Sequence, residues 1–159
     1  MTRNRRPSSV YSLMDEMTAS PSKPMPQAMR NAQLTQMLTG LNGLETSLEP
    51  THRDWQVVSD AINLMETLVK MKVCEDESGL LTDAITAMAK AGQRHLAGKN
   101  LRLDALGIQA VRAVIEDYAS MLNTVSHRDM VRCHRQTEKR ILEILKGKCL
   151  PHDVKVIAI

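Results

Sequence analysis

The sequence predicts an all-α protein, an up-and-down bundle of four to five helices. Its 159 residues include no Phe, one Trp and two Tyr, whereas eleven Met join Leu, Ile, Val and Ala in an apolar content of 43%. Aromatic side chains favour strands and supply large buried areas, so a core without them favours packed helices. Apolar residues also recur at three- and four-residue steps along most of the chain. The length fits one domain.

The chain divides into a tail, 1–25, a bundle domain, 26–148, and an extended segment, 149–159. The tail repeats Ser and Pro after its first arginines, a composition that buries too little apolar surface to offset the entropy of ordering. We therefore expect a disordered basic tail. Its arginines are Arg3, Arg5 and Arg6. Apolar residues at helical spacing would let a stretch around 10–18 fold against a partner or a second subunit. The alternative is a solvated tail with incidental apolar residues.

The first helix is expected over 27–48, and Pro50 ends it. Gly40 and Gly43 weaken this prediction, because each Gly costs about 1 kcal/mol relative to Ala inside a helix. We expect this helix to bend, to break, or to depend on tertiary packing.

The next two helices have clear starts and ends. Thr51 is an N-cap with Asp54 three residues on, close to a capping box although Asp replaces the usual Glu or Gln, and this helix ends near Cys74. The third helix spans about 80–96, with Gly98 as its stop. Its many Ala residues allow a neighbouring helix to come close.

The last two helices complete the predicted bundle. The helix over 104–124 has the clearest apolar period in the chain, and Ser126 caps a final helix that ends at Gly147. Beyond it, residues 154–159 are β-branched and alternating, typical of an edge strand or an extended tail laid on the bundle. A lone strand needs a partner, which a second copy of the chain or another protein would supply.

Charge and cysteine usage limit the class of protein. A formal charge of +3 is too mild to indicate nucleic-acid binding by itself. Cys74, Cys133 and Cys149 form no CxxC pair and are odd in number, so we expect neither a disulfide framework nor a structural zinc. With no apolar run of 18 residues, we expect no membrane span and no secretion, and therefore a cytoplasmic protein.

No motif points to an enzyme. The chain has no GxSxG, no phosphate-binding Gly-rich loop and no HExxH or ExxH, and Cys133 falls on a predicted apolar face. His127 and His134 lie two helical turns apart, which is half a ligand set at most. We expect no catalytic residue, no metal and no cofactor.

The final helix carries a positive stripe at positions i, i+4, i+7 and i+11. The stripe consists of Arg128, Arg132, Arg135 and Lys139. Such a stripe can contact phosphates or an acidic protein surface. Asp129, Glu138 and Glu143 interrupt it, so a solvated, self-neutralised face is the alternative. No aromatic residues are interleaved for base stacking, so sequence-specific readout of nucleic acid is not indicated.

Methionine is concentrated in the first third of the chain. The residues are Met14, Met17, Met25, Met29 and Met37. Flexible thioethers form adaptable binding surfaces, but they also fill ordinary cores, and both interpretations stay open here.

Three runs of the chain carry a resemblance: residues 54–64, 103–112 and 137–141. In order and spacing they resemble small helical proteins of unknown function from proteobacterial phages and prophages. The resemblance implies an origin in a mobile element. Proteins of that origin are often inhibitors of host machinery, including CRISPR defence, or regulators of phage genes.

We therefore expect a non-enzymatic interaction module that binds and blocks a host protein or protein complex. The alternative is a nucleic-acid-binding regulator that uses the basic tail and stripe. A homodimer through residues 10–48 or the C-terminal segment is a further expectation. The expected partner-binding residues are Arg3, Arg5, Arg6, Leu13, Met17, Arg128, Arg132, Arg135 and Lys139.

Overall fold

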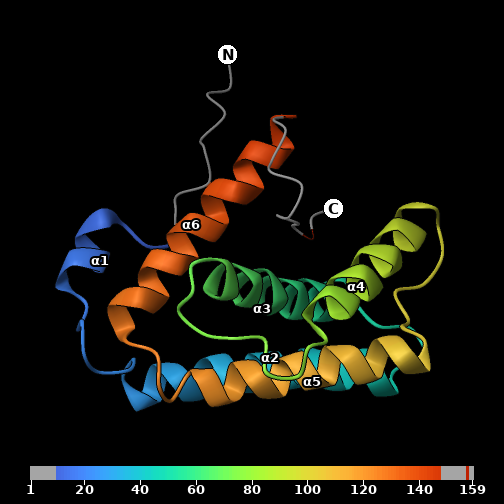
Figure 1. The fold of residues 1–159 in the computed structure, drawn as a ribbon. Coiled ribbons are helices and arrows are strands. Elements are labelled where there is room, and N and C mark those ends of the chain that lie inside the picture. The colour runs from blue at the N-terminus through green and yellow to red at the C-terminus, as the bar shows by residue number, and fades with distance from the viewer. Residues whose placement is uncertain (1–9, 148–156, 158–159) are drawn as a thin grey trace.

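The structure, a computed structural model, describes residues 10–147 and Ile157. This part of the chain contains six helices and no strand, which confirms the all-α class. The helices are α1 (Leu13–Thr18), α2 (Gln27–Thr46), α3 (His52–Lys70), α4 (Leu81–Leu96), α5 (Ala105–Met121) and α6 (His127–Leu145), shown in Figure 1.

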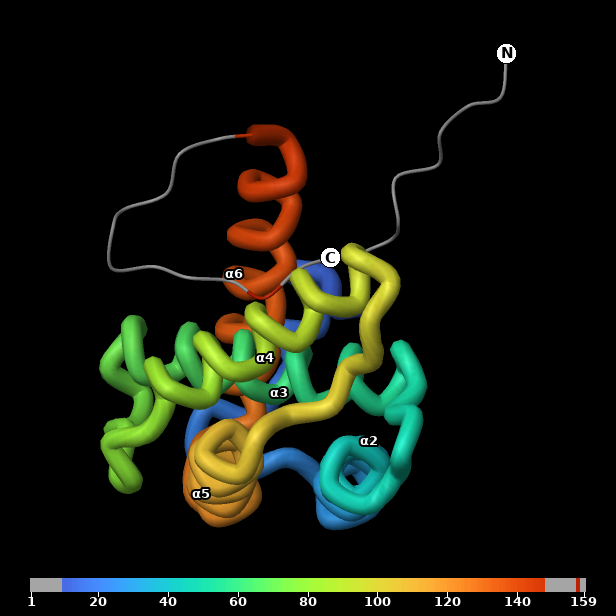
Figure 2. The backbone as a smooth tube through the Cα atoms, turned by 90° about the vertical axis from the view of Figure 1, so that its right-hand side faces the viewer, coloured from blue at the N-terminus to red at the C-terminus, as the bar shows by residue number. Residues whose placement is uncertain are grey.

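The helices are arranged around α3. Helices α2 and α5 lie side by side as one layer, α3 and α4 run obliquely across them, and α6 rises steeply from α3 (Figures 1 and 2). Helix α3 packs against α2, α4, α5 and α6, while α1 packs on α6. Because α3, α4 and α6 run in other directions than the layer of α2 and α5, the arrangement differs from the expected up-and-down bundle. This arrangement arises because α3 has buried residues on several sides, and each of these sides packs against another helix.

The start of α3 has the capping box that the sequence predicts. The Thr51 hydroxyl accepts a hydrogen bond from the Asp54 backbone N–H at 3.1 Å, and the Asp54 carboxylate accepts one from the Thr51 N–H at 3.0 Å. Trp55 directly follows Asp54 and is buried, and its indole N–H donates to the Met88 carbonyl at 3.0 Å. The cap fixes the start of α3, and the indole bond holds α3 against α4.

Helix α2 runs unbroken through both of its glycines. A Cβ on Gly40 would lie 3.0 Å from the Asp54 carbonyl oxygen, and one on Gly43 would lie 2.5 Å from the Asp54 carboxylate. The glycines therefore let α2 approach the first turn of α3 closely. Of the three outcomes expected for this helix, dependence on tertiary packing is the one observed.

The expectation of a disordered tail over 1–25 is wrong for residues 10–25. Ser12 and Asp15 form a capping box at the start of α1, and Ala19 and Met25 are buried. Local capping and contacts with α6 supply the stabilisation that composition alone does not reveal. Arg3, Arg5 and Arg6 lie outside the described residues.

The methionines divide between the core and the surface. Met25 and Met37 belong to the hydrophobic core, so for these two residues the core interpretation holds and the binding-surface interpretation does not. Met14 and Met17 on α1 are 65% and 62% exposed.

Of the extended segment expected over 149–159, only Ile157 lies within the described residues. Its side chain is buried in the core, and its backbone is bonded to Asn63 of α3. Over the described parts of the chain, none of the helices combines the length and the apolarity that crossing a bilayer requires.

Candidate interaction surface on helices α1 and α6

Two arginines of the predicted stripe hold α1 against α6. The Arg128 guanidinium donates to the carbonyls of Met17 and Ala19, at 2.9 and 3.2 Å. Arg135 pairs with the Glu16 carboxylate at 2.5 Å. The end of α1 thus presents a carboxylate and carbonyls, both negative, to the positive side of α6.

The other two stripe residues face solvent. Arg132 pairs with Asp129, one turn back on its own helix, at 2.9 Å. Lys139 is exposed. The four positions therefore do not form one continuous cationic face, which differs from the expectation for Arg128 and Arg135. Sequence spacing places them on one side of α6, but it does not show that α1 packs on that side.

Backbone contacts complete the attachment of the N-terminal segment. The Val10 N–H donates to the Glu138 carboxylate at 3.0 Å, and the Tyr11 ring meets the His134 ring edge-on at 5.3 Å. After α1, the carbonyls of Ser20 and Lys23 accept from the N–H groups of Arg128 and His127, at 3.0 and 2.8 Å. These carbonyls satisfy N–H groups in the first turn of α6 that have no partner within that helix.

Helix α1 has its apolar side chains on the outside. It has no buried residue, and its half-buried carboxylate, Glu16, is the side chain that pairs with α6. The apolar side chains of this segment are Val10 (74% exposed), Leu13 (56%), Met14 (65%) and Met17 (62%), which we call the α1 patch. This is the reverse of an ordinary amphipathic helix, which buries its apolar face. Leu13 and Met17 were predicted as partner-binding residues from their spacing, and the structure places them together on this patch.

A pocket of about 380 Å³ lies beside the α1 segment, with Val10 among its lining residues. Helices α2, α3, α5 and α6 all contribute to it. At its wall the Tyr118 hydroxyl donates to the Gln33 side-chain oxygen at 3.1 Å. Burial lowers the pKa of His134 to about 4, so this imidazole is neutral at pH 7. The sequence pattern did not indicate this pocket, because its lining comes from helices far apart in the chain.

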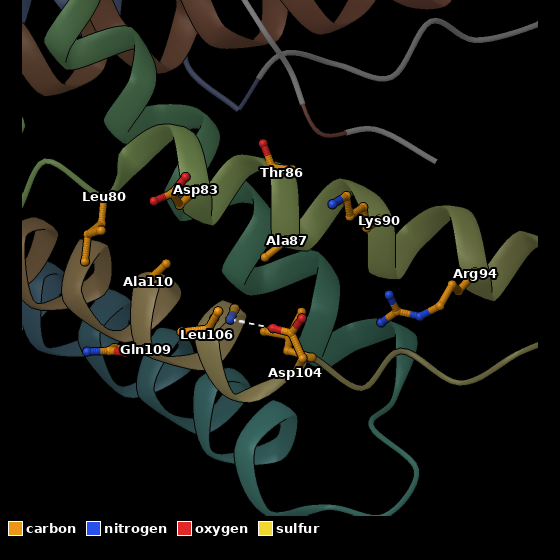
Figure 3. A pocket seen from close by; sticks show the side chains of 12 residues that line it. Leu80, Asp83, Thr86, Ala87, Lys90, Arg94, Asp104, Leu106, Gln109 and Ala110 are labelled. Carbon is orange, nitrogen blue, oxygen red and sulfur yellow. Dashed lines mark hydrogen bonds between the residues drawn. The ribbon is translucent and has the colours of Figure 1, made fainter.

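A second hollow, of about 400 Å³, lies between α4 and α5 (Figure 3). Gly107 lets the helices meet, since a Cβ there would lie 3.0 Å from the Ala87 Cβ. The Asp104 carboxylate is used as the N-cap of α5, accepting from the Gly107 N–H at 2.6 Å. Lys90 and Arg94 line the same hollow from α4, so it presents both signs of charge.

Of the described cysteines, Cys133 is buried in the core and Cys74 is partly buried against it. Burial raises the pKa of Cys74 to about 11 and that of Cys133 to about 12, so both thiols are protonated at neutral pH. A protonated, buried thiol is a poor nucleophile and a poor metal ligand. Within residues 10–147 and Ile157, no three His, Cys, Asp or Glu side chains are grouped as a metal ion requires.

Comparison of this chain with protein-family models, curated proteins and solved structures finds no match. The resemblance to phage and prophage proteins therefore stays a prediction.

Proposed function

We propose that this chain is a non-enzymatic protein-interaction module that docks a partner protein through the α1 patch. One observation carries the proposal: α1 turns its apolar side chains outward and holds α6 through polar contacts. Exposed apolar side chains gathered on one surface are typical of protein-binding sites. A flexible Met pair beside Leu suits a surface that adapts to its partner.

The exposed cations of α6 define the edge of this docking surface. Arg132 and Lys139 lie on the helix that carries α1, and both face solvent. The complementary partner has an apolar centre and an acidic margin. Following the resemblance, that partner is a host protein or complex, and the module acts by occupying its surface.

The nucleic-acid-binding alternative has less support. Arg128 and Arg135 are engaged with α1, so a phosphate would have to compete with carbonyls and a carboxylate already in place. The basic residues Arg3, Arg5 and Arg6 keep this alternative as an outcome of the test below.

The test is partner capture from a nuclease-treated proteobacterial lysate, at moderate and at high salt, with the chain carrying both Leu13→Asp and Met17→Asp. Neither side chain is buried, so we expect the helical circular dichroism of this variant to match the unmodified chain. The control is Leu106→Asp, an apolar residue of α5 that is 77% exposed and belongs to another surface.

We expect a stoichiometric protein to be retained by the unmodified chain and by the Leu106 control, and to be lost from the double variant. Equal retention by the double variant, or no stoichiometric protein in any sample, contradicts the proposal. Retention that disappears with nuclease or salt supports the nucleic-acid alternative, because phosphate contacts weaken steeply as salt rises.

A further inference from the structure

Asn63 of α3 binds both backbone groups of a residue 94 positions away. Its side-chain nitrogen donates to the Ile157 carbonyl at 2.9 Å, and its side-chain oxygen accepts from the Ile157 N–H at 2.8 Å. Asn63 and Ile157 are 1% and 3% exposed, so this pairing takes place away from water.

This geometry is that of peptide recognition. In extended backbone, the N–H and C=O of one residue point to the same side, and an antiparallel strand normally pairs with both. A carboxamide side chain has one donor and one acceptor side by side, so it takes the place of that strand. The backbone contacts give affinity for any extended segment, and the enclosed side chain selects which residue fits.

Asn63 belongs to a row of buried polar residues on α3. The members of the row are Ser59, Asn63, Glu66 and Thr67. The later part of the row faces α6, where Arg140 bonds to Glu66 at 2.7 Å and to Thr67 at 2.5 Å. At the other end, Ser59 is fully buried, and its hydroxyl has no hydrogen-bond partner within the described residues. The row therefore continues past Asn63 with a polar group available to a bound backbone.

We propose that Asn63 anchors a peptide-binding socket on α3 that takes an extended segment with a β-branched apolar side chain, and that Ile157 of the same chain is its resident occupant. Residues 148–156 tether Ile157 to the end of α6. Because Ile157 belongs to the same chain as the socket, its binding is intramolecular, so the resident residue excludes a free peptide of the same sequence. Removing the Ile157 side chain opens the socket to that peptide.

The test uses the full-length chain with Ile157→Asp and a fluorescein-labelled peptide of residues 153–159, followed by fluorescence anisotropy. We expect this variant to bind the peptide at least about tenfold more tightly than the unmodified chain, since the tethered competitor is lost. Adding Asn63→Leu, a change of similar shape that removes both hydrogen bonds, abolishes the gain. A peptide of the same length with Asp in place of Ile157 serves as the side-chain control.

Equal binding to the unmodified and Ile157→Asp chains, or a gain that survives Asn63→Leu, overturns the proposal. If circular dichroism shows that Ile157→Asp has lost its helices, Ile157→Ala takes its place with the same expected order of affinities. The proposal can also be tested on the unmodified chain, without any substitution. Hydrogen exchange of the Ile157 amide in the unmodified chain is expected to be slow, and exchange at the rate of an unstructured peptide overturns the socket.

Discussion

At the residue scale, the buried polar side chains of this protein depend on partners from other helices. The Arg140 guanidinium of α6 lies 2.7 Å from the Glu66 carboxylate of α3, with 8% and 5% of the side chains exposed. The Thr67 and Thr137 hydroxyls lie 2.6 Å apart beside this pair. Burying an unpaired charge costs free energy, and in this pair the attraction between the two charges offsets part of that cost.

We predict that Arg140→Leu lowers the free energy of unfolding by about 3–5 kcal/mol, because the Glu66 carboxylate is left buried without its guanidinium. Urea denaturation measures this change. The matched control is Arg112→Leu, whose pair with Glu45 is largely exposed on the arginine side and is expected to contribute less than about 1 kcal/mol. Similar small losses in both variants would contradict the burial of the Arg140 pair.

His134 makes stability depend on pH. Burial lowers its pKa from 6.5 to about 4, so between these values the unfolded chain binds a proton that the folded chain does not. The free energy of unfolding should therefore be highest above pH 6.5 and fall by up to about 3 kcal/mol as pH drops toward 4. Denaturation at pH 7.5 and pH 5 measures the slope. We expect His134→Asn to flatten it, and an unchanged slope would show that His134 is not the cause.

At the scale of secondary-structure elements, α1 and α3 obtain their stability in different ways. Both begin with a capping box, but α3 buries residues on several sides, whereas α1 has six residues and buries none. An isolated helix of that length is unstable in water. Helix α1 persists because its cap and the arginines of α6 replace apolar burial.

We predict that Arg128→Met releases α1 without unfolding the rest, since this arginine binds the Met17 and Ala19 carbonyls. Hydrogen exchange of the α1 amides should become at least about tenfold faster, which corresponds to about 1.4 kcal/mol of local stability. Exchange in α3 should not change. Arg132→Met is the control, because Arg132 pairs with Asp129 on its own helix. Equal protection of α1 in both variants would refute this attachment.

At the scale of the whole molecule, one core is organised around α3. Its neighbours come from both halves of the chain, and most of the buried apolar residues of α2, α3, α4, α5 and α6 belong to one hydrophobic cluster with Met25 and Ile157. Residues from the N-terminal segment (Met25) and from the C-terminal segment (Ile157) therefore belong to the same core. Helix α1 turns its apolar side chains away from that body, and this combination underlies the proposed interaction surface.

Much of the helical content was predictable from local pattern. The five longer helices, the Thr51 cap and the Ser126 cap follow from spacing within a few residues, and these interactions form wherever the same local sequence is helical. The candidate surface was predictable only in part. Helical spacing identified Leu13 and Met17 as candidates, but the composition of residues 10–25 predicted disorder where the structure has a capped helix.

Contacts between distant residues decided the rest. From the sequence alone, Gly40 is expected to weaken its helix, but in the structure it allows α3 to pack closely against α2. The sequence likewise suggests Arg128 as a phosphate ligand, whereas in the structure its guanidinium binds the backbone of α1. The pairing of Asn63 with Ile157 joins positions 94 residues apart, and no periodicity encodes it. Local spacing specifies which residues share a face of a helix, whereas the tertiary structure specifies what that face meets, because this depends on how all the helices pack at once.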